Sequence, residues 1–145
     1  MTAKTLILVE HDRRQVKRPS LHAISAARQV GDDFALLLLG HALDEMANSL
    51  ANYGASAVLV ADDAALAEPL AGRYAAVIAD AFQKISATTL LGTSSTFSKD
   101  ILPRAAALLD APMLTDVLAI ENKDGAISYR RPISAGSLLA TVELA

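Results

Sequence analysis

Four short apolar runs alternate with stretches of helical spacing, and this alternation constrains the fold more than any other feature of the chain. The runs cover residues 5–10, 34–40, 57–61 and 87–91. Each is about as long as one strand and apolar at successive positions, which is typical of a strand buried on both faces of a sheet. Strands of this kind belong to parallel sheets with helices on both sides. The sequence therefore predicts an α/β fold of three layers, with a doubly wound, mainly parallel sheet between helices.

Helices are expected between these runs, because apolar residues recur there at intervals of three and four. Pro19 and Ser20 open the first helix, with Ser20 as its cap, and Gly31 closes it. A second helix is predicted over residues 43–53, and a third over residues 69–83. The four runs and their helices form βα units in series.

A turn rich in glycine and hydroxyl groups follows the fourth run and leads into another helix. This helix is predicted from about Ser98 to residue 109, which places Pro103 in its first turn, where proline is tolerated. A turn between a strand end and a helix start can hold an anion. It can equally be a capped helix entry that binds no ligand, and it lacks both the P-loop lysine and the three-glycine dinucleotide fingerprint. The candidate phosphate-binding residues are Gly92, Thr93, Ser94 and Ser95.

Further polar residues stand where other strands end. His11 and Asp12 follow the first strand, at the sheet edge where ligands gather in open α/β folds, or they are solvated loop residues. Residues 13–18 are basic and could contact a phosphate or an acidic partner, although such runs are usually solvated. Asp62 and Asp63 are expected to cap the next helix rather than to hold a metal. No catalytic residue and no metal site is predicted.

The pattern changes after residue 112. Strands are expected over residues 113–120, 126–131 and 137–144, with Asp124 and Gly125 forming a hairpin turn between the first two. The sequence therefore predicts a β-hairpin and a last strand as an extension of the α/β fold. A strand in the final position suggests that something docks or continues beyond it.

Length and composition narrow the class of protein. A chain of 145 residues corresponds to a single domain, residues 1–145. The net charge of −3 argues against nucleic-acid binding, and the absence of cysteine excludes disulfides and thiolate metal sites. No apolar run has the length of a membrane span, and residues 1–5 lead into a strand without a signal peptide. A soluble, cytoplasmic protein without a targeting peptide is expected, with no insertion into a membrane.

Several segments share their residues with one known family. These segments are Val9-Glu10-His11-Asp12, Pro19-Ser20-Leu21, Tyr53-Gly54-Ala55, residues 58–62, residues 91–94 followed by 99–104, and residues 131–133 with 135–136 and 140–142. Together they resemble the N-terminal domain of the electron-transfer flavoprotein alpha subunit, and the likeness extends over essentially the whole chain. The loop of residues 94–99 is longer than usual for that family, and Ser134 and Ser137 replace the commoner Tyr and Asn.

The resemblance implies a heterodimer with a beta subunit that carries electrons. The donors would be dehydrogenases such as the acyl-CoA dehydrogenases of fatty acid beta-oxidation, and the acceptor a quinone oxidoreductase of the respiratory chain. FAD would be held mainly by a C-terminal domain that is missing here, so this piece is expected to bind no cofactor and to act as a structural and docking domain, not an enzyme. The implied fold is the adenine nucleotide alpha hydrolase-like one, which the beta subunit shares.

Two other functions remain open at this point. The chain could be a stand-alone adenine-nucleotide-binding module of the same fold, with Gly92, Thr93, Ser94 and Ser95 around the phosphate and residues 9–11 beside the adenine. An independent hydrolase is the third alternative. It would require a nucleophile paired with a base, which three scattered histidines do not establish.

Overall fold

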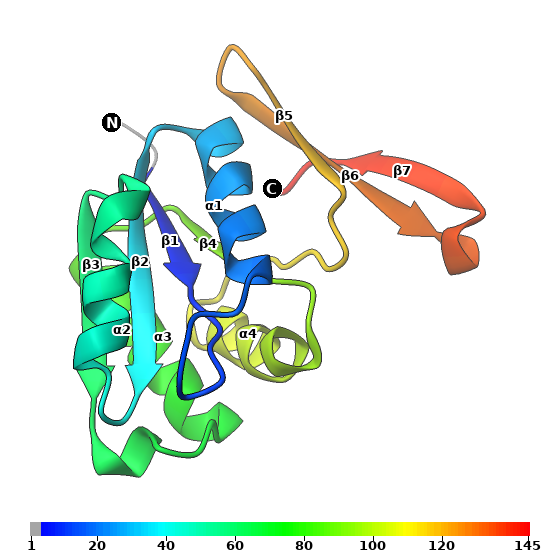
Figure 1. Ribbon diagram of the computed structural model, residues 1–145. Helices are drawn as coiled ribbons and strands as arrows, with labels where there is room; N and C mark the ends of the chain where they lie inside the picture. The colour runs from blue at the N-terminus through cyan, green and yellow to red at the C-terminus, as the bar shows by residue number, and fades with distance from the viewer. Residues whose placement is uncertain (1–3) are drawn as a thin grey trace.

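The computed structural model describes residues 4–145 and contains a parallel sheet of four strands (Figure 1). The strands are β1 (Lys4–Leu8), β2 (Asp33–Gly40), β3 (Ala57–Asp62) and β4 (Thr89–Leu91), in the order β3-β2-β1-β4. All three neighbouring pairs are parallel, as predicted. Residues 1–3, which are part of the segment that suggested the absence of a targeting peptide, lie outside the described residues.

Helices cover both faces of this sheet. α1 (Pro19–Val30) and α2 (Asp44–Ser49) pack on one face, and α3 (Ala71–Lys84) and α4 (Thr96–Leu108) pack on the other (Figure 1). Alternate side chains of one strand serve the two cores, because successive residues of a strand point to opposite faces. Leu6 of β1, for example, joins the core under α3 and α4, whereas the next residue, Ile7, joins the core under α1 and α2. The prediction of a three-layer, doubly wound α/β fold is confirmed.

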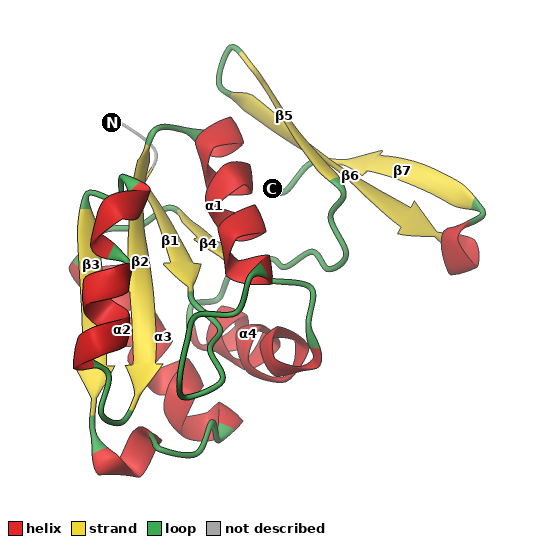
Figure 2. Ribbon diagram, viewed as in Figure 1, coloured by secondary structure: helices red, strands yellow, loops and turns green. Residues whose placement is uncertain are grey.

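A second, antiparallel sheet of three strands follows the α/β body. It consists of β5 (Ala119–Lys123), β6 (Ala126–Ile133) and β7 (Leu138–Val142), in that order, and we call it the arm. Asp124 and Gly125 have φ values of 53° and 90°, which is the type I′ geometry that the Asp-Gly pair predicted. The arm meets the body beside α1, and its far end extends away from the helices (Figure 2).

Helix α1 begins at Pro19 as predicted, but its predicted cap and the predicted start of α4 are wrong. Ser20 is inside α1 and does not cap it, because its hydroxyl accepts from the N–H of Glu10 at 2.9 Å and donates to the carbonyl of the same residue. Helix α4 begins at Thr96, with Ser95 as its cap, so Pro103 lies in the helix interior and not in its first turn. There it cannot donate the hydrogen bond that the carbonyl of Lys99 would otherwise receive.

Two other predicted elements are shorter than expected. The apolar stripe over residues 43–53 forms α2 followed by a separate 3₁₀ turn, η1 (Ala51–Tyr53), because the helix ends at Leu50 before Gly54 turns left-handed at φ 80°. Residues 113–118 form no strand, and regular pairing begins only at Ala119. Of the predicted cap residues, Asp63 accepts from the N–H of Ala65 at the start of η2 (Ala64–Leu66). Asp62 does not cap that helix, because its carboxylate accepts from the N–H groups of Ala42 and Leu43 before α2. A short 3₁₀ turn, η3 (Ser134–Gly136), connects β6 to β7. Within residues 4–145, no helix has the length and apolar composition needed to cross a bilayer.

Candidate functional site

The carboxyl ends of β1 and β4 form the place where this fold would hold a ligand. From β1 the chain crosses through α1 to β2 on one side, whereas β4 is reached through α3 and pairs with β1 on the other side. Crossovers therefore leave in opposite directions at the β1–β4 pair, and ligands of open α/β sheets bind at such a switch point. Glu10 follows β1, and the glycine and hydroxyl turn follows β4.

Glu10 fills this crevice with a buried carboxylate. Its side chain accepts from the ammonium of Lys17 at 2.9 Å and from the hydroxyl of Thr93 at 2.8 Å, and the residue is only 6% exposed. Burial by itself raises the pKa of Glu10, but hydrogen bonds from Lys17, Ser95 and Thr93 outweigh it and hold the pKa below its ordinary value. The same contact with Glu10 raises the pKa of Lys17. The carboxylate is therefore ionised at neutral pH and paired inside the chain.

The four predicted phosphate-binding residues lie together at this point, and each already has a role within the chain. The hydroxyl of Ser95 caps α4 by accepting from the N–H of Ser98 at 3.1 Å, and that of Ser94 donates to the carboxylate of Asp116 at 2.7 Å. A Cβ at Gly92 would lie 2.6 Å from a methyl carbon of Leu102, so glycine is required there by the close packing of α4. Thr93 binds Glu10, as described above. Two of the four side chains thus donate to carboxylates, so in this structure these two hydroxyls are not available to donate to an anionic ligand.

Asp116 belongs to this cluster of polar groups and was not predicted from the sequence. Its carboxylate accepts from Lys99 at 2.8 Å and from Ser94 at 2.7 Å, and it connects the segment before the arm to the start of α4. The contact with Lys99, followed by that with Ser94, lowers the pKa of Asp116 to about 2. The residue has φ 56°, an uncommon backbone conformation for aspartate, which the surrounding contacts hold in place. Nothing in the local sequence signals this contact, because its partners are 17 and 22 residues away.

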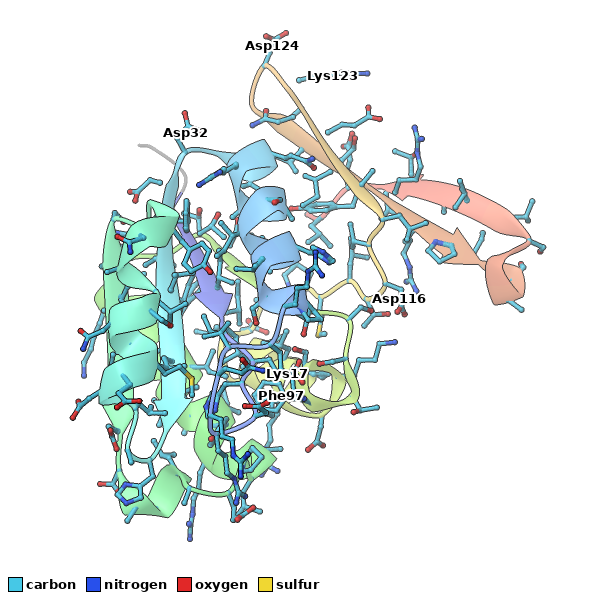
Figure 3. The ribbon with its side chains drawn as sticks, in the orientation of Figure 1. Lys17, Asp32, Phe97, Asp116, Lys123 and Asp124 are labelled. Carbon is cyan, nitrogen blue, oxygen red and sulfur yellow. The ribbon has the colours of Figure 1, made fainter. Side chains whose placement is uncertain are left out.

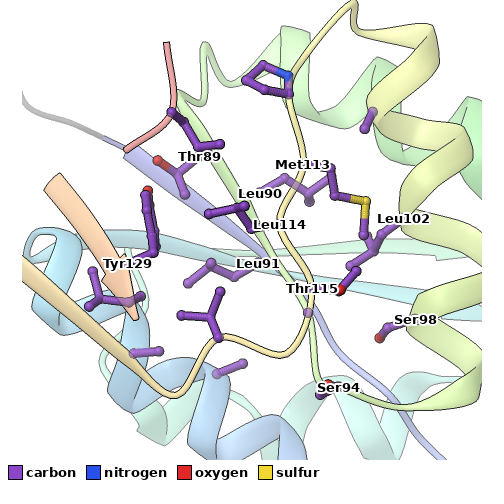
Figure 4. A pocket seen from close by; sticks show the side chains of 18 of the residues that line it. Thr89, Leu90, Leu91, Ser94, Ser98, Leu102, Met113, Leu114, Thr115 and Tyr129 are labelled. Atoms are coloured by element: carbon purple, nitrogen blue, oxygen red, sulfur yellow. The ribbon is translucent and has the colours of Figure 1, made fainter. Parts of the chain in front are cut away.

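An apolar cavity of about 490 Å³ lies behind these polar groups. Strand β4 and the segment of residues 113–118 form its two sides, and α4 and Tyr129 of the arm contribute to its walls (Figure 4). Leu90, Leu91, Leu102 and Leu114 line it. Because β4 pairs only with β1 among the described strands, its other edge faces this cavity.

His11 and Asp12 organise the loop after β1. One ring nitrogen of His11, Nε2, donates to the carbonyl of Leu39 at 2.7 Å, and the other accepts from the N–H of Arg13. Asp12 accepts two backbone N–H groups of the same loop. The ring of His11 and the carboxylate of Asp12 thus form hydrogen bonds within the chain; Asp12 is exposed, as the loop alternative predicted, whereas His11 is half-buried. Within residues 4–145, no three acidic or imidazole side chains gather in a way that could hold a metal ion.

The basic segment after His11 is mostly solvated, as expected for a charge run. Arg13 pairs with Glu68 at 2.6 Å, and both side chains are about two-thirds exposed. Lys17, labelled in Figure 3, is the exception, because its ammonium pairs with the carboxylate of Glu10. Arg14 and Arg18 are exposed, and of the basic residues of this segment only Lys17 contacts Glu10 of the crevice.

Comparisons with known proteins agree on one family. The family model described as "Electron transfer flavoprotein domain" matches residues 5–145. The chain is 34% identical over 139 residues to the electron transfer flavoprotein subunit alpha of Pseudomonas aeruginosa, covering 95% of this chain and 43% of that protein. It is 38% identical over 144 residues to the mitochondrial electron transfer flavoprotein subunit alpha of Arabidopsis thaliana, with 95% of this chain and 39% of the relative covered. The chain thus spans about two fifths of the length of the curated relatives it matches.

Proposed function

The chain belongs to the electron transfer flavoprotein domain family, and from this membership we propose that it is a structural and docking domain of an electron transfer flavoprotein. In this proposal it contributes a protein-binding surface and no redox chemistry of its own. It works with a beta subunit and FAD in an assembly that carries electrons from dehydrogenases, such as those that oxidise acyl-CoA, toward a quinone oxidoreductase of the respiratory chain.

One observation carries the docking role. The arm and the segments at its two ends expose large apolar side chains. These are Leu118, Ile133, Leu138, Leu139 and Leu144, each at least 40% exposed. Apolar side chains gathered on one extended element are typical of a protein interface.

The residues of the crevice do not fit FAD. Its pyrophosphate requires free donors and positive charge, whereas the hydroxyls of Thr93 and Ser94 donate to Glu10 and Asp116. The positive charge of Lys17 is paired with Glu10 as well. We therefore assign the flavin to other parts of the assembly.

Assembly with the beta subunit tests the proposal. The purified chain and the cognate beta subunit, mixed at about 10 μM, are expected to co-elute in size-exclusion chromatography with light scattering, as a complex with Kd of about 1 μM would. Separate elution of the two proteins in that experiment, together with a flat calorimetric titration, would contradict the docking role. Flavin retained by this chain alone would contradict the assignment of FAD to other parts.

A further inference from the structure

One face of the arm continues past the body. Residues that pair directly across strands share a face, so Tyr129, Arg131 and Ile133 of β6 lie on the same side as Ala140 and Leu138 of β7. At its near end this face is turned toward the body, since Tyr129 lines the cavity. At its far end Ile133 is 40% and Leu138 58% exposed. The same apolar face is thus covered at one end and open at the other, where the arm extends away from the helices (Figure 1).

Arg131 lies at the boundary between the covered and the open part of this face. Its guanidinium has five N–H donors, and the structure gives it one hydrogen bond, from Nη2 to the hydroxyl of Thr115 at 3.5 Å. Its Nε is buried and has no partner among residues 4–145. The other half-buried cation of the described chain, Lys4, has a carboxylate, that of Asp33, at 4.0 Å. Arg131 forms no ion pair within residues 4–145.

The neighbouring Arg130, in contrast, has an ion-pair partner within the arm. It points to the opposite face, is exposed, and binds the carboxylate of Glu121 on β5 at 3.3 Å. The two arginines are adjacent in sequence and carry the same charge. They differ in that the acidic partner of Arg131 is not provided within the described chain.

We propose that the far end of this face docks a protein partner that supplies a carboxylate to Arg131 and apolar side chains to Ile133 and Leu138. This inference rests on the proposed docking function and identifies the residues that carry it. Arginine forms planar, two-point hydrogen bonds with carboxylates and is enriched, with large apolar residues, at the energetic centres of interfaces. A nucleic acid or an anionic membrane would instead require a cluster of cations, and here one arginine stands among apolar side chains. Side chains commonly change rotamer on binding, which would bring the buried Nε to the partner.

Calorimetric titration of the beta subunit with matched arginine variants tests the proposal. Arg131→Gln is expected to weaken the affinity at least tenfold, whereas Arg130→Gln, on the opposite face, changes it less than about threefold. Arg131→Lys keeps the charge but not the planar fork and is expected to fall between the wild type and Arg131→Gln. Added salt should weaken wild-type binding more than it weakens binding of Arg131→Gln.

A second variant guards against a folding defect. Leu138→Ser removes an apolar side chain that is more than half exposed, so it leaves the fold intact and is expected to weaken the affinity at least fivefold. Circular dichroism and thermal unfolding of each variant confirm that it is folded. Equal affinities for the Arg131→Gln, Leu138→Ser and Arg130→Gln variants would overturn this inference alone. A wild-type chain that does not bind the beta subunit would overturn the proposed function and this inference with it.

Discussion

Strand β2 of the body is buried along nearly its whole length, whereas β7 of the arm leaves Leu138 and Leu139 more than half exposed. Both strands are rich in leucine, so composition does not explain the difference. In the body, two helices cover each face of the sheet. In the arm, only part of one face of the sheet is covered, where it meets α1 and the cavity. The difference teaches that the buried core which stabilises the chain lies in the body. The apolar side chains at the far end of the arm add little to that core and remain accessible to a binding partner.

The sharpest test of that division is a pair of leucine truncations. Leu38→Ala, in the buried core of β2, is expected to lower the free energy of unfolding by about 2–5 kcal/mol, because it removes buried methyl groups and leaves a cavity. Leu139→Ala, on the arm, removes a side chain that is 59% exposed and is expected to cost less than about 0.5 kcal/mol. Urea unfolding of both variants measures the two values. Similar losses would show that the arm is packed as tightly as the body.

Alanine substitutions at two glycines distinguish the cost of a packing clash from the cost of backbone strain. Gly92→Ala is expected to cost about 2 kcal/mol, because its Cβ would meet buried Leu102 at 2.6 Å. Gly136→Ala, in the arm, meets nothing within 4 Å but has φ 85°, so it is expected to cost about 1 kcal/mol through backbone conformation alone. Thermal unfolding compares them. A larger loss for Gly136→Ala would contradict the close packing of α4 on the strand end.

A buried and an exposed ion pair can be compared in the same way, by the stability that is lost when each is broken. Glu10→Gln breaks a buried carboxylate away from Lys17 and is expected to cost about 1–2 kcal/mol at pH 7, since Lys17 is half-exposed and solvent screens the pair. Glu121→Gln breaks the exposed pair with Arg130 and is expected to cost less than about 0.5 kcal/mol. Chemical unfolding at several pH values measures both.

The pH dependence of the Glu10 variant has a defined sign. Because the folded-state pKa of Glu10 is lowered, its contribution is complete above the pKa of the unfolded chain and is lost as the pH falls through the folded-state pKa. The stability gap between wild type and Glu10→Gln is therefore expected to narrow in acid. A gap that is constant or widens below pH 4 would show that the carboxylate is not held ionised.

Asp116 makes one of the contacts between the two regions, and its loss is expected to have a smaller effect. Asp116→Asn removes the negative charge that Lys99 and Ser94 contact, so amide hydrogen exchange in residues 113–118 is expected to accelerate while the body is unchanged. Because the pKa of Asp116 is lowered to about 2, the wild-type contact persists above the ordinary aspartate range and is lost as the pH falls toward 2. Exchange mass spectrometry provides the measurement, with Asp110→Asn, exposed at the end of α4, as control. Equal exchange in both variants would argue against the contact.

The smallest effect is expected when the chain is titrated with nucleotides. Nucleotide binding at the turn after β4 would place the function in the body and not in the arm. Calorimetry of the wild type with AMP or ATP is expected to show no binding tighter than about 100 μM, roughly −5.5 kcal/mol, because Glu10 and Asp116 occupy the hydroxyls of the turn. Tighter binding that depends on Thr93 would favour the nucleotide-binding alternative over the docking function.

Local patterns predicted most of the fold. The apolar runs predicted the strands of the parallel sheet, and the Asp124-Gly125 pair predicted the hairpin with its type I′ turn. These features depend on residues that are close together in the sequence. The alternation of strands and helices along the chain predicts the crossover connections between parallel strands. The start of α4 was misplaced because Pro103 was assumed to need the first turn, whereas the cap at Ser95 determines where the helix begins.

The site was harder to predict because its contacts join distant parts of the chain. The sequence analysis singled out Gly92, Thr93, Ser94 and Ser95, and these four do lie together at the switch point. It did not predict the acids opposite them, since Glu10 is 83 residues from Thr93 and Asp116 is 22 from Ser94. Ser20 was misassigned for the same reason, because its hydroxyl bonds a residue ten positions earlier instead of its own helix.

The connectivity of the arm has a kinetic consequence. Its strands follow one another through tight turns, whereas β1 and β4 of the body are partners separated by more than 80 residues. Hairpins close within microseconds, and sheets built from distant segments assemble far more slowly. A two-stranded hairpin alone is only marginally stable in water, so the β5–β6 hairpin is expected to form and dissolve many times before β7 and the body give it a surface to pack on.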